Sequence, residues 1–220
     1  MSIDGVNILF SWICGDEESE ISNLKEQAAA GNEQAKIELA ALDAENAENV
    51  SENIAFLEQA AQKDDVAANL YLGVIYSEGI AENGDTQKPK VILPQDWNKS
   101  NSYLEKAIGL GSIAAYSVRG MHTWLHCCTF WNRDDEDEAD NIMEPPVAQD
   151  YLDGEKYLLE FVALKDDKTL DEEKKAYVEE LFEIFASWLS GLYGCENPVS
   201  PIYNKEKSLE WEKKQAEVRK

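Results

Sequence analysis

The sequence predicts an all-α protein built from antiparallel helical hairpins that stack along the chain. Three observations predict this class. Three segments align with one another without gaps, apolar residues recur at helical spacing in about nine segments, and strand signals are nearly absent. One hairpin cannot bury its apolar face alone, so consecutive hairpins stack on one another. We therefore expect about four hairpins in one right-handed α-solenoid domain over residues 1–220.

The three aligned segments begin at Leu24, Leu57 and Leu104. In each segment a helix ends in small residues, and a Gly or Asp then supplies a turn that needs a positive φ or a helix cap. The next helix opens with Ala and has a small residue where it crosses its neighbour. The corresponding positions are Ala28, Ala61 and Ile108; Gly31, Asp64 and Gly111; Ala35, Ala68 and Ala115; and Ala40, Gly73 and Gly120.

The repeat is clear over about residues 20–125, and residues 151–220 are expected to hold divergent copies of it. A segment rich in turn formers, 81–96, separates the second and third turns, and only residues 90–93 within it have an extended pattern. In chain order, the expected helices span roughly residues 19–30, 33–44, 51–62, 65–78, 96–109, 112–130, 151–164, 171–192 and 204–218.

The repeated pattern resembles the Sel-one-like repeat, a relative of the tetratricopeptide repeat. The pattern is AA-x-x-G-x-x-x-A-x-x-x-LG-x-x-Y-x-x-G. The copy at Gly111 has Arg119 for Leu and Thr123 for Tyr, and the copy at Gly31 has Asp43 for Tyr. The resemblance implies a binding scaffold or adaptor that is not an enzyme. The best copy consists of Ala60, Ala61, Asp64 in the Gly place, Ala68, Leu72, Gly73, Tyr76 and Gly79.

The charge balance excludes several classes of partner. The 44 acidic residues outnumber the 20 basic ones, which gives a net charge of −24 at pH 7. Such a protein repels nucleic acid phosphates and anionic membrane surfaces, so neither is an expected partner. Hydrophobic residues make up 44% of the chain, which is enough for a packed core.

The first residues and the cysteines favour a cytoplasmic protein with reduced thiols. The apolar stretch at residues 6–14 is too short to span a bilayer, and no base precedes it as a secretory signal requires. Four cysteines in a chain of 220 residues are not a disulfide framework.

A cluster of His and Cys residues is a candidate metal site. His122 and His126 are four residues apart on one predicted helix and share a face, and Cys127 or Cys128 is a third ligand at most. No second group of ligands is obvious. Packing of small polar and thiol side chains in a partly buried helix explains the same residues, so we predict no metal and no cofactor.

An acidic run lies in a predicted loop at about residues 131–150. Two hypotheses fit it: a solvated charge run, or an electrostatic arm that steers a basic partner. The spacing and the central Gly of an EF-hand calcium loop are absent. The acids of the run are Asp134, Asp135, Glu136, Asp137, Glu138 and Asp140.

The concave face of the predicted solenoid is unexpectedly apolar. By analogy with the tetratricopeptide repeat, the first helix of each hairpin lines this face, and large exposed apolar patches usually mark interaction sites. Two alternatives are a register that is off by one residue and coverage of the groove by residues 6–14. The partner-binding candidates are Leu70, Val74, Met121, Trp124 and Leu125; the register also places Gln34, Ile37, Ala41, Ala67, Ala114 and Ser117 there.

These observations predict a non-catalytic protein-binding module. No nucleotide-binding, zinc-protease or serine-hydrolase motif is present. The leading hypothesis is an acidic bacterial immunity protein that binds and occludes a cognate basic toxin, for example a nuclease. The alternatives are a general adaptor that binds a peptide or helix in the groove, a metal-binding protein or enzyme that uses the His and Cys cluster, and a mimic of DNA. The sequence does not predict an oligomeric state.

Overall fold

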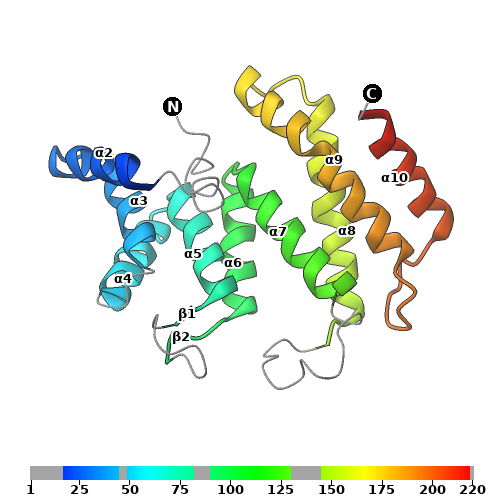
Figure 1. The fold of residues 1–220 in the computed structure, drawn as a ribbon, viewed down its shortest axis with the longest axis horizontal. Helices are drawn as coiled ribbons and strands as arrows, with labels where there is room; N and C mark the ends of the chain where they lie inside the picture. The colour runs from blue at the N-terminus through cyan, green and yellow to red at the C-terminus, as the bar shows by residue number, and fades with distance from the viewer. Residues whose placement is uncertain (1–16, 45–48, 82–89, 130–144, 219–220) are drawn as a thin grey trace. The chain divides into compact units, whose positions relative to one another are not determined.

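A computed structural model describes residues 17–44, 49–81, 90–129 and 145–218 of the chain (Figure 1). The chain forms two compact units, residues 1–115 and 116–220. In the described ranges nearly all regular structure is helical, and the two short strands form one small hairpin. The predicted all-α array of antiparallel hairpins is therefore confirmed. The expectation of a single domain over residues 1–220 stays a prediction.

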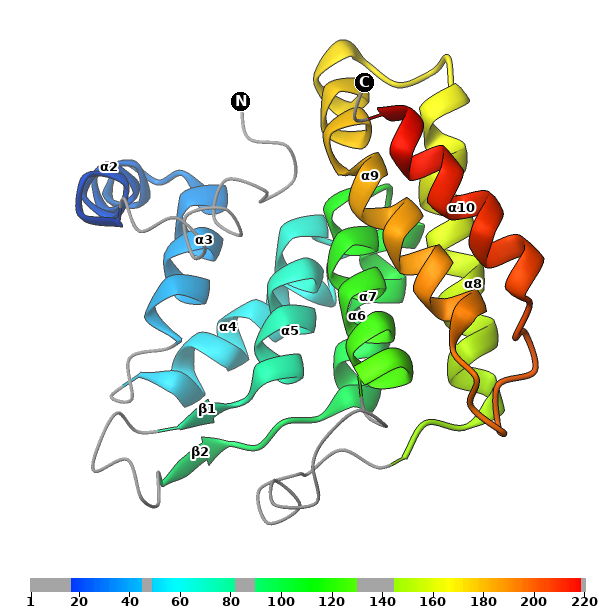
Figure 2. The same ribbon diagram turned by 45° about the vertical axis from the view of Figure 1, so that its right-hand side comes forward.

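The first unit contains five helices in the part that the structure describes (Figure 2). Consecutive helices pack against each other from α2 to α6, with the insertion between α5 and α6. The five helices are α2 (Glu17–Ala29), α3 (Glu33–Asp43), α4 (Val50–Ala61), α5 (Val66–Glu78) and α6 (Trp97–Gly109).

The three predicted turns share one geometry. Gly31, Asp64 and Gly111 have φ values of 94°, 61° and 96°, so all three adopt the positive φ that was one of the two expected roles of these positions. At each turn the backbone N–H of this residue donates to the carbonyl three residues earlier, and the following N–H donates to the carbonyl five residues earlier. These are the two hydrogen bonds of a Schellman motif, which satisfies the last carbonyls of the preceding helix.

The residue after each turn caps the next helix. The Asn32 side chain accepts from the N–H of Gln34 at 3.0 Å, and the Asp65 carboxylate accepts from the N–H of Ala68 at 2.8 Å. The Ser112 hydroxyl accepts from the N–H of Ala115 at 3.2 Å. The helix-turn-helix boundaries of the repeat are therefore determined by local sequence.

Small residues permit close helix crossings, as predicted. A Cβ atom on Gly73 of α5 would lie 2.6 Å from the Leu104 side chain of α6, so a larger residue there would require Leu104 to shift. At the same crossing the Ser100 hydroxyl donates to the Gly73 carbonyl at 2.6 Å. The core of the first unit packs around this region, and it includes Leu57, Ala68, Tyr71, Leu72 and Ile75.

The insertion between α5 and α6 has one short strand near each end, and the two strands pair as a small antiparallel hairpin. β1 (Ile80–Ala81) pairs with β2 (Val91–Leu93), with Ile80 opposite Leu93. Gly79 precedes β1 with a φ of 70°, and a Cβ atom there would lie 2.8 Å from the Leu93 carbonyl. The extended pattern predicted at residues 90–93 is confirmed, whereas β1 was not predicted.

The second unit contains the helices from α7 onward. α7 (Ala114–Trp124) continues into a π-helical turn, η1 (Leu125–Thr129), and α8 (Ala148–Ala163) ends in a short 3-10 turn, η4 (Leu164–Asp166). α9 (Glu172–Gly194) packs against both α8 and α10 (Lys205–Val218). The nine predicted helices are thus confirmed, with boundaries that differ by a few residues.

Glycines again mark the helix crossings of the second unit. A Cβ atom on Gly120 of α7 would lie 2.8 Å from Leu158 of α8 and 3.1 Å from Trp188 of α9. The Phe161 and Phe185 rings stack nearby, with centroids 3.6 Å apart, and both side chains are fully buried. Within the described ranges, no helix is both long and apolar enough to cross a membrane.

Candidate functional site

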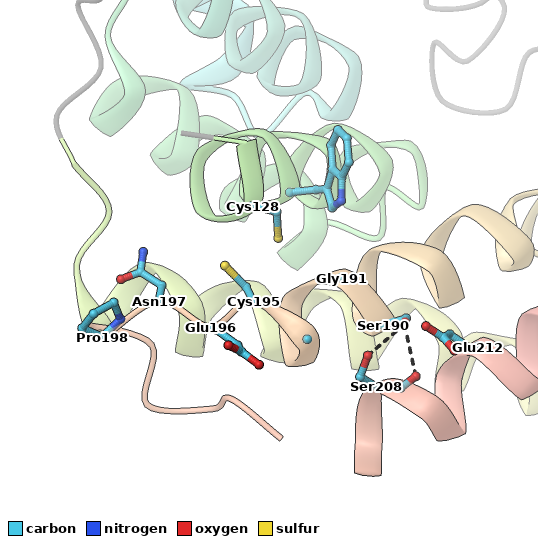
Figure 3. A pocket seen from close by; sticks show the side chains of 11 residues that line it. Cys128, Ser190, Gly191, Cys195, Glu196, Asn197, Pro198, Ser208 and Glu212 are labelled. Carbon is cyan, nitrogen blue, oxygen red and sulfur yellow. Dashed lines mark hydrogen bonds between the residues drawn. The ribbon is translucent and has the colours of Figure 1, made fainter. Parts of the chain in front are cut away.

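A pocket of about 720 Å³ in the second unit is the candidate site (Figure 3). The end of α7, the π-turn that follows it, the last turn of α9, the loop after α9 and the first half of α10 form its walls. The lining combines two thiols, two carboxylates, one indole ring and small residues. The lining residues are Trp124, Cys128, Ser190, Gly191, Gly194, Cys195, Glu196, Asn197, Pro198, Ser208 and Glu212.

A buried polar network fixes one end of the pocket. The Asn197 amide donates to the Tyr151 hydroxyl at 2.7 Å, and this hydroxyl donates to the Cys127 carbonyl at 3.0 Å. The Cys195 thiol also donates to the Cys127 carbonyl, with Sγ and O 3.6 Å apart. The Cys127 carbonyl of the π-turn is therefore the acceptor that Tyr151 and Cys195 share. The loop after α9 is therefore tied to the end of α7.

A second network holds α10 against α8 and α9. The Tyr193 hydroxyl donates to the Glu155 carboxylate at 2.6 Å, and Lys207 Nζ lies 3.3 Å from the same carboxylate. Ser190 of α9 donates to the backbone carbonyl of Ser208 in α10 at 3.1 Å. These contacts come from side chains that are far apart in the sequence, and together they position the α10 wall of the pocket.

Two of the thiols lie together at the pocket wall. Figure 3 shows Cys128 and Cys195 pointing toward each other from the π-turn and from the end of α9, and both side chains line the pocket. Both are half-buried, whereas the neighbouring Cys127 is fully buried. The sequence offered no signal for this pair, because Cys195 lies far along the chain from Cys128.

Burial determines the protonation of the site. Burial, followed by the neighbouring Cys195, raises the pKa of the Cys128 thiol to about 12. Burial also raises the pKa of Cys127 and of Tyr151 well above their usual ranges. These groups are therefore neutral at pH 7, while the Glu196 and Glu212 side chains are exposed to solvent.

The predicted His and Cys cluster does not form a ligand set. His122 is only 3% exposed, and burial together with Arg119 lowers its pKa to about 3. His126 instead lies beside Asp150, with Nδ1 and Oδ2 3.9 Å apart. Among the described residues, no three His, Cys, Asp or Glu side chains gather as metal ligands would.

The partner-binding candidates fall into two groups. Leu70 and Val74 are 0% and 3% exposed, so the prediction that they form an exposed apolar face is wrong. The register identified their helix correctly, but helical spacing alone does not show what covers a helix face. Met121 is 39% exposed, and Trp124 and Leu125 are half-buried, so this stretch does reach the surface of the second unit.

Most of the other residues that were placed in the predicted groove are also buried in the core. Ile37, Ala41, Ala67 and Ala114 are buried, while Gln34 is exposed and Ser117 is half-buried. The acidic run at residues 134–140 and the apolar stretch at residues 6–14 lie outside the described residues.

Comparisons with known proteins yield one structural likeness. No protein-family model matches the sequence, and no curated protein matches it. A crystal structure of a Sel1 repeat protein from Oxalobacter formigenes is similar over 98% of this chain and 86% of that chain, with 16% identity and a TM-score of 0.36.

Proposed function

We propose that this protein is a non-catalytic, protein-binding module whose partner is a basic protein. The observation that carries the proposal is the uncompensated charge. Even if every one of the 20 bases were paired with an acid, 24 carboxylates would have no basic partner in the chain. An excess of this size attracts a cationic surface and raises its association rate at low salt.

The acidic excess belongs to both units. Residues 1–115 contain 20 acids against 7 bases, and residues 116–220 contain 24 against 13. The excess is therefore a property of the helical array as a whole and not of one tail. Each unit therefore offers an acidic excess of its own to a basic partner.

Many of the described bases contact acids or aromatic rings within the chain. Lys106 lies 2.9 Å from Asp64, and Lys214 lies 2.9 Å from Glu210 and over the Trp211 ring. The ion pairs neutralise acids one for one and the ring contacts neutralise none, so the net excess of 24 acids remains. Others with such contacts are Lys36, Lys99, Arg119, Lys156, Lys165, Lys175 and Lys207.

An apolar stripe supplies the second part of the proposed interface. Met121, Trp124 and Leu125 have the i, i+3, i+4 spacing of one helix face, and all three are at least partly exposed. Aromatic and Met side chains of this kind are typical of interface centres. In the sequence the stripe is soon followed by Asp134–Asp140. We propose that the stripe and this acidic run form one binding surface.

In its finer form, the proposal is an immunity protein that occludes a basic toxin. A toxin that acts on nucleic acid has a cationic cleft for phosphates, and an acidic protein seated over such a cleft blocks access to it. A general adaptor that binds a peptide through the Met121 stripe, with the acids serving only solubility, is the second candidate. The two differ in how much of the affinity depends on the acidic run.

The experiment measures binding to purified basic proteins encoded by the genes that flank this one. In the test variant, all six acids of the 134–140 run are changed to Asn or Gln. Loss of these charges is expected to weaken binding at least tenfold at low salt, which corresponds to about 1.4 kcal/mol. Met121→Ser is expected to weaken binding in both candidate functions.

The matched control changes six exposed acids elsewhere in the second unit. If the 134–140 run contacts the partner specifically, the control variant loses much less affinity than the test variant. Equal affinity of the test variant and the unmodified protein would rule out the immunity form and favour the adaptor. The control residues are Asp166, Glu173, Glu179, Glu180, Glu206 and Glu217.

A further inference from the structure

Two separate elements of the second unit bring the Cys128 and Cys195 thiols together at the pocket wall. Cys195 caps the C-terminus of α9, and Cys128 lies in the π-turn that follows α7. The side chains of the two residues face each other (Figure 3), and both line one open pocket. The bond from Cys195 to the Cys127 carbonyl further holds Cys195 at the π-turn.

We propose that Cys128 and Cys195 form a reversible disulfide by exchange with a small-molecule disulfide that enters this pocket. The chemical class of the co-reactant is a low-molecular-weight disulfide such as oxidised glutathione. The product ties the end of α7 to the end of α9. This modification is independent of any partner protein.

The exchange proceeds in two balanced steps. The Cys195 thiol loses its proton to solvent, and its sulfur attacks one sulfur of the small disulfide, which breaks that S–S bond and releases one thiolate. Cys128 then loses its proton and attacks the Cys195 sulfur of the mixed disulfide, releasing the second thiolate. The two released thiolates take up the two protons. Two protein thiols are thus oxidised to one disulfide, and one small disulfide is reduced to two thiols.

The environments of the thiols determine this order. Burial raises the pKa of Cys128, so little of it is thiolate at neutral pH and it is a poor first nucleophile. Its place against Cys195 nevertheless makes the second, intramolecular step fast. Cys127 is fully buried, and its own raised pKa removes it from competition. Cys195 therefore reacts first and Cys128 resolves the mixed disulfide.

The experiment treats the full-length protein with oxidised glutathione and maps the products by mass spectrometry without reduction. Cleavage by trypsin places Cys14 in residues 1–25, Cys127 and Cys128 in residues 120–133, and Cys195 in residues 176–205. We expect a crosslink between the last two peptides that reductant reverses. The oxidised protein is expected to melt roughly 5–10 °C higher, because the crosslink closes a long loop of the unfolded chain.

Single variants assign the two roles. Cys128→Ser, or Cys128→Ala if the Ser variant folds poorly, is expected to accumulate glutathione on Cys195. Cys195→Ser is expected to give no crosslink, and Cys127→Ser is expected to keep it. A crosslink that survives Cys128→Ser would overturn the proposal, as would stable glutathione on Cys195 of the unmodified protein. Reaction at Cys14 without reaction at Cys195 would also overturn it.

Discussion

At the scale of single residues, the second unit buries a neutral imidazole beside a buried guanidinium. His122 is 3% exposed and Arg119 is 7% exposed, and Arg119 Nη1 donates to the Thr123 hydroxyl at 3.2 Å. The guanidinium also lies over the Tyr157 ring, 5.1 Å from its centroid. A second positive charge on His122 would be repelled by Arg119 and poorly solvated. His122, one of the two histidines that suggested metal chemistry, is therefore a buried neutral side chain of the core.

His122 makes stability depend on pH. Its pKa is about 3 in the folded protein, against about 6.5 when unfolded, so the unfolded state takes up a proton first as the pH falls. The contribution of neutral His122 is complete above pH 6.5 and is lost progressively as the pH falls toward 3. Between pH 6.5 and pH 5 we expect a loss of about 2 kcal/mol in the free energy of unfolding.

Urea titrations of the unmodified protein and of His122→Gln measure this effect. The variant removes the imidazole but leaves every carboxylate in place, so the difference between the two curves isolates His122. Parallel curves over this pH range would show that His122 titrates normally in the folded protein.

A substitution at Gly120 tests whether the close helix crossing in the second unit contributes to stability. Gly120→Ala places a Cβ atom 2.8 Å from Leu158, and overpacking of this kind is expected to lower the free energy of unfolding by roughly 1–3 kcal/mol. Gly109→Ala is the matched control, because nothing lies within 4 Å of a Cβ atom at the end of α6. In the control variant the free energy of unfolding is expected to rise by up to about 1 kcal/mol. Equal losses in the two variants would argue against the crossing.

At the scale of elements, one turn is built three times from different residues. Gly31 and Gly111 adopt a positive φ without steric cost, whereas Asp64 adopts it with a Cβ atom. Asp64 also lies 2.9 Å from Lys106 of α6, but both side chains are well exposed, so this ion pair contributes little. The shared geometry explains why the repeat could be aligned without gaps.

Substitutions at the turns are expected to have opposite effects. Asp64→Gly relieves the left-handed strain and is expected to leave stability unchanged or to raise it by up to about 1 kcal/mol. Gly111→Ala introduces that strain and is expected to lower stability by about 1 kcal/mol. Thermal unfolding of the two variants makes the comparison. A larger loss for Asp64→Gly than for Gly111→Ala would show that the Asp64 side chain, and not the φ value, is what the turn needs.

Helices and turns could be predicted because their signals are local. Capping residues, small residues and helical spacing all lie within one hairpin, so Asn32, Asp65 and Ser112 mark helix starts in the sequence alone. β1 was missed because a strand of two residues has no period. Its partner lies across an insertion, so its pairing is a tertiary property.

The candidate site was largely unpredictable for the same reason. The polar network at one end of the pocket joins Cys127, Tyr151 and Cys195, which come from three separate parts of the chain. Helical spacing placed Leu70 and Val74 on one face but did not show that this face is buried. The metal hypothesis relied on the spacing of four residues between His122 and His126. Residues that pack on one face of a helix have the same spacing, so it does not distinguish a metal site from a core.

At the scale of the whole molecule, charge is the property that distinguishes this protein from an ordinary helical array. The chain has a net charge of −24 at pH 7, and acids outnumber bases in both units. A scaffold needs some net charge for solubility, but an excess of this size raises the electrostatic self-repulsion of the folded state. A basic partner would relieve this repulsion, so binding is expected to stabilise the protein as well as occlude the partner.

The dependence of affinity on salt tests the central claim most directly. The measurement is the dissociation constant of the complex with a basic protein encoded beside this gene, taken at several ionic strengths, with poly-lysine as the non-specific control. We predict tight binding that weakens steeply as salt rises, because screening acts on exposed charge pairs. The specific partner should remain bound at salt concentrations that release poly-lysine. Affinity that does not change with salt, or no binding of any such basic protein, would contradict the claim.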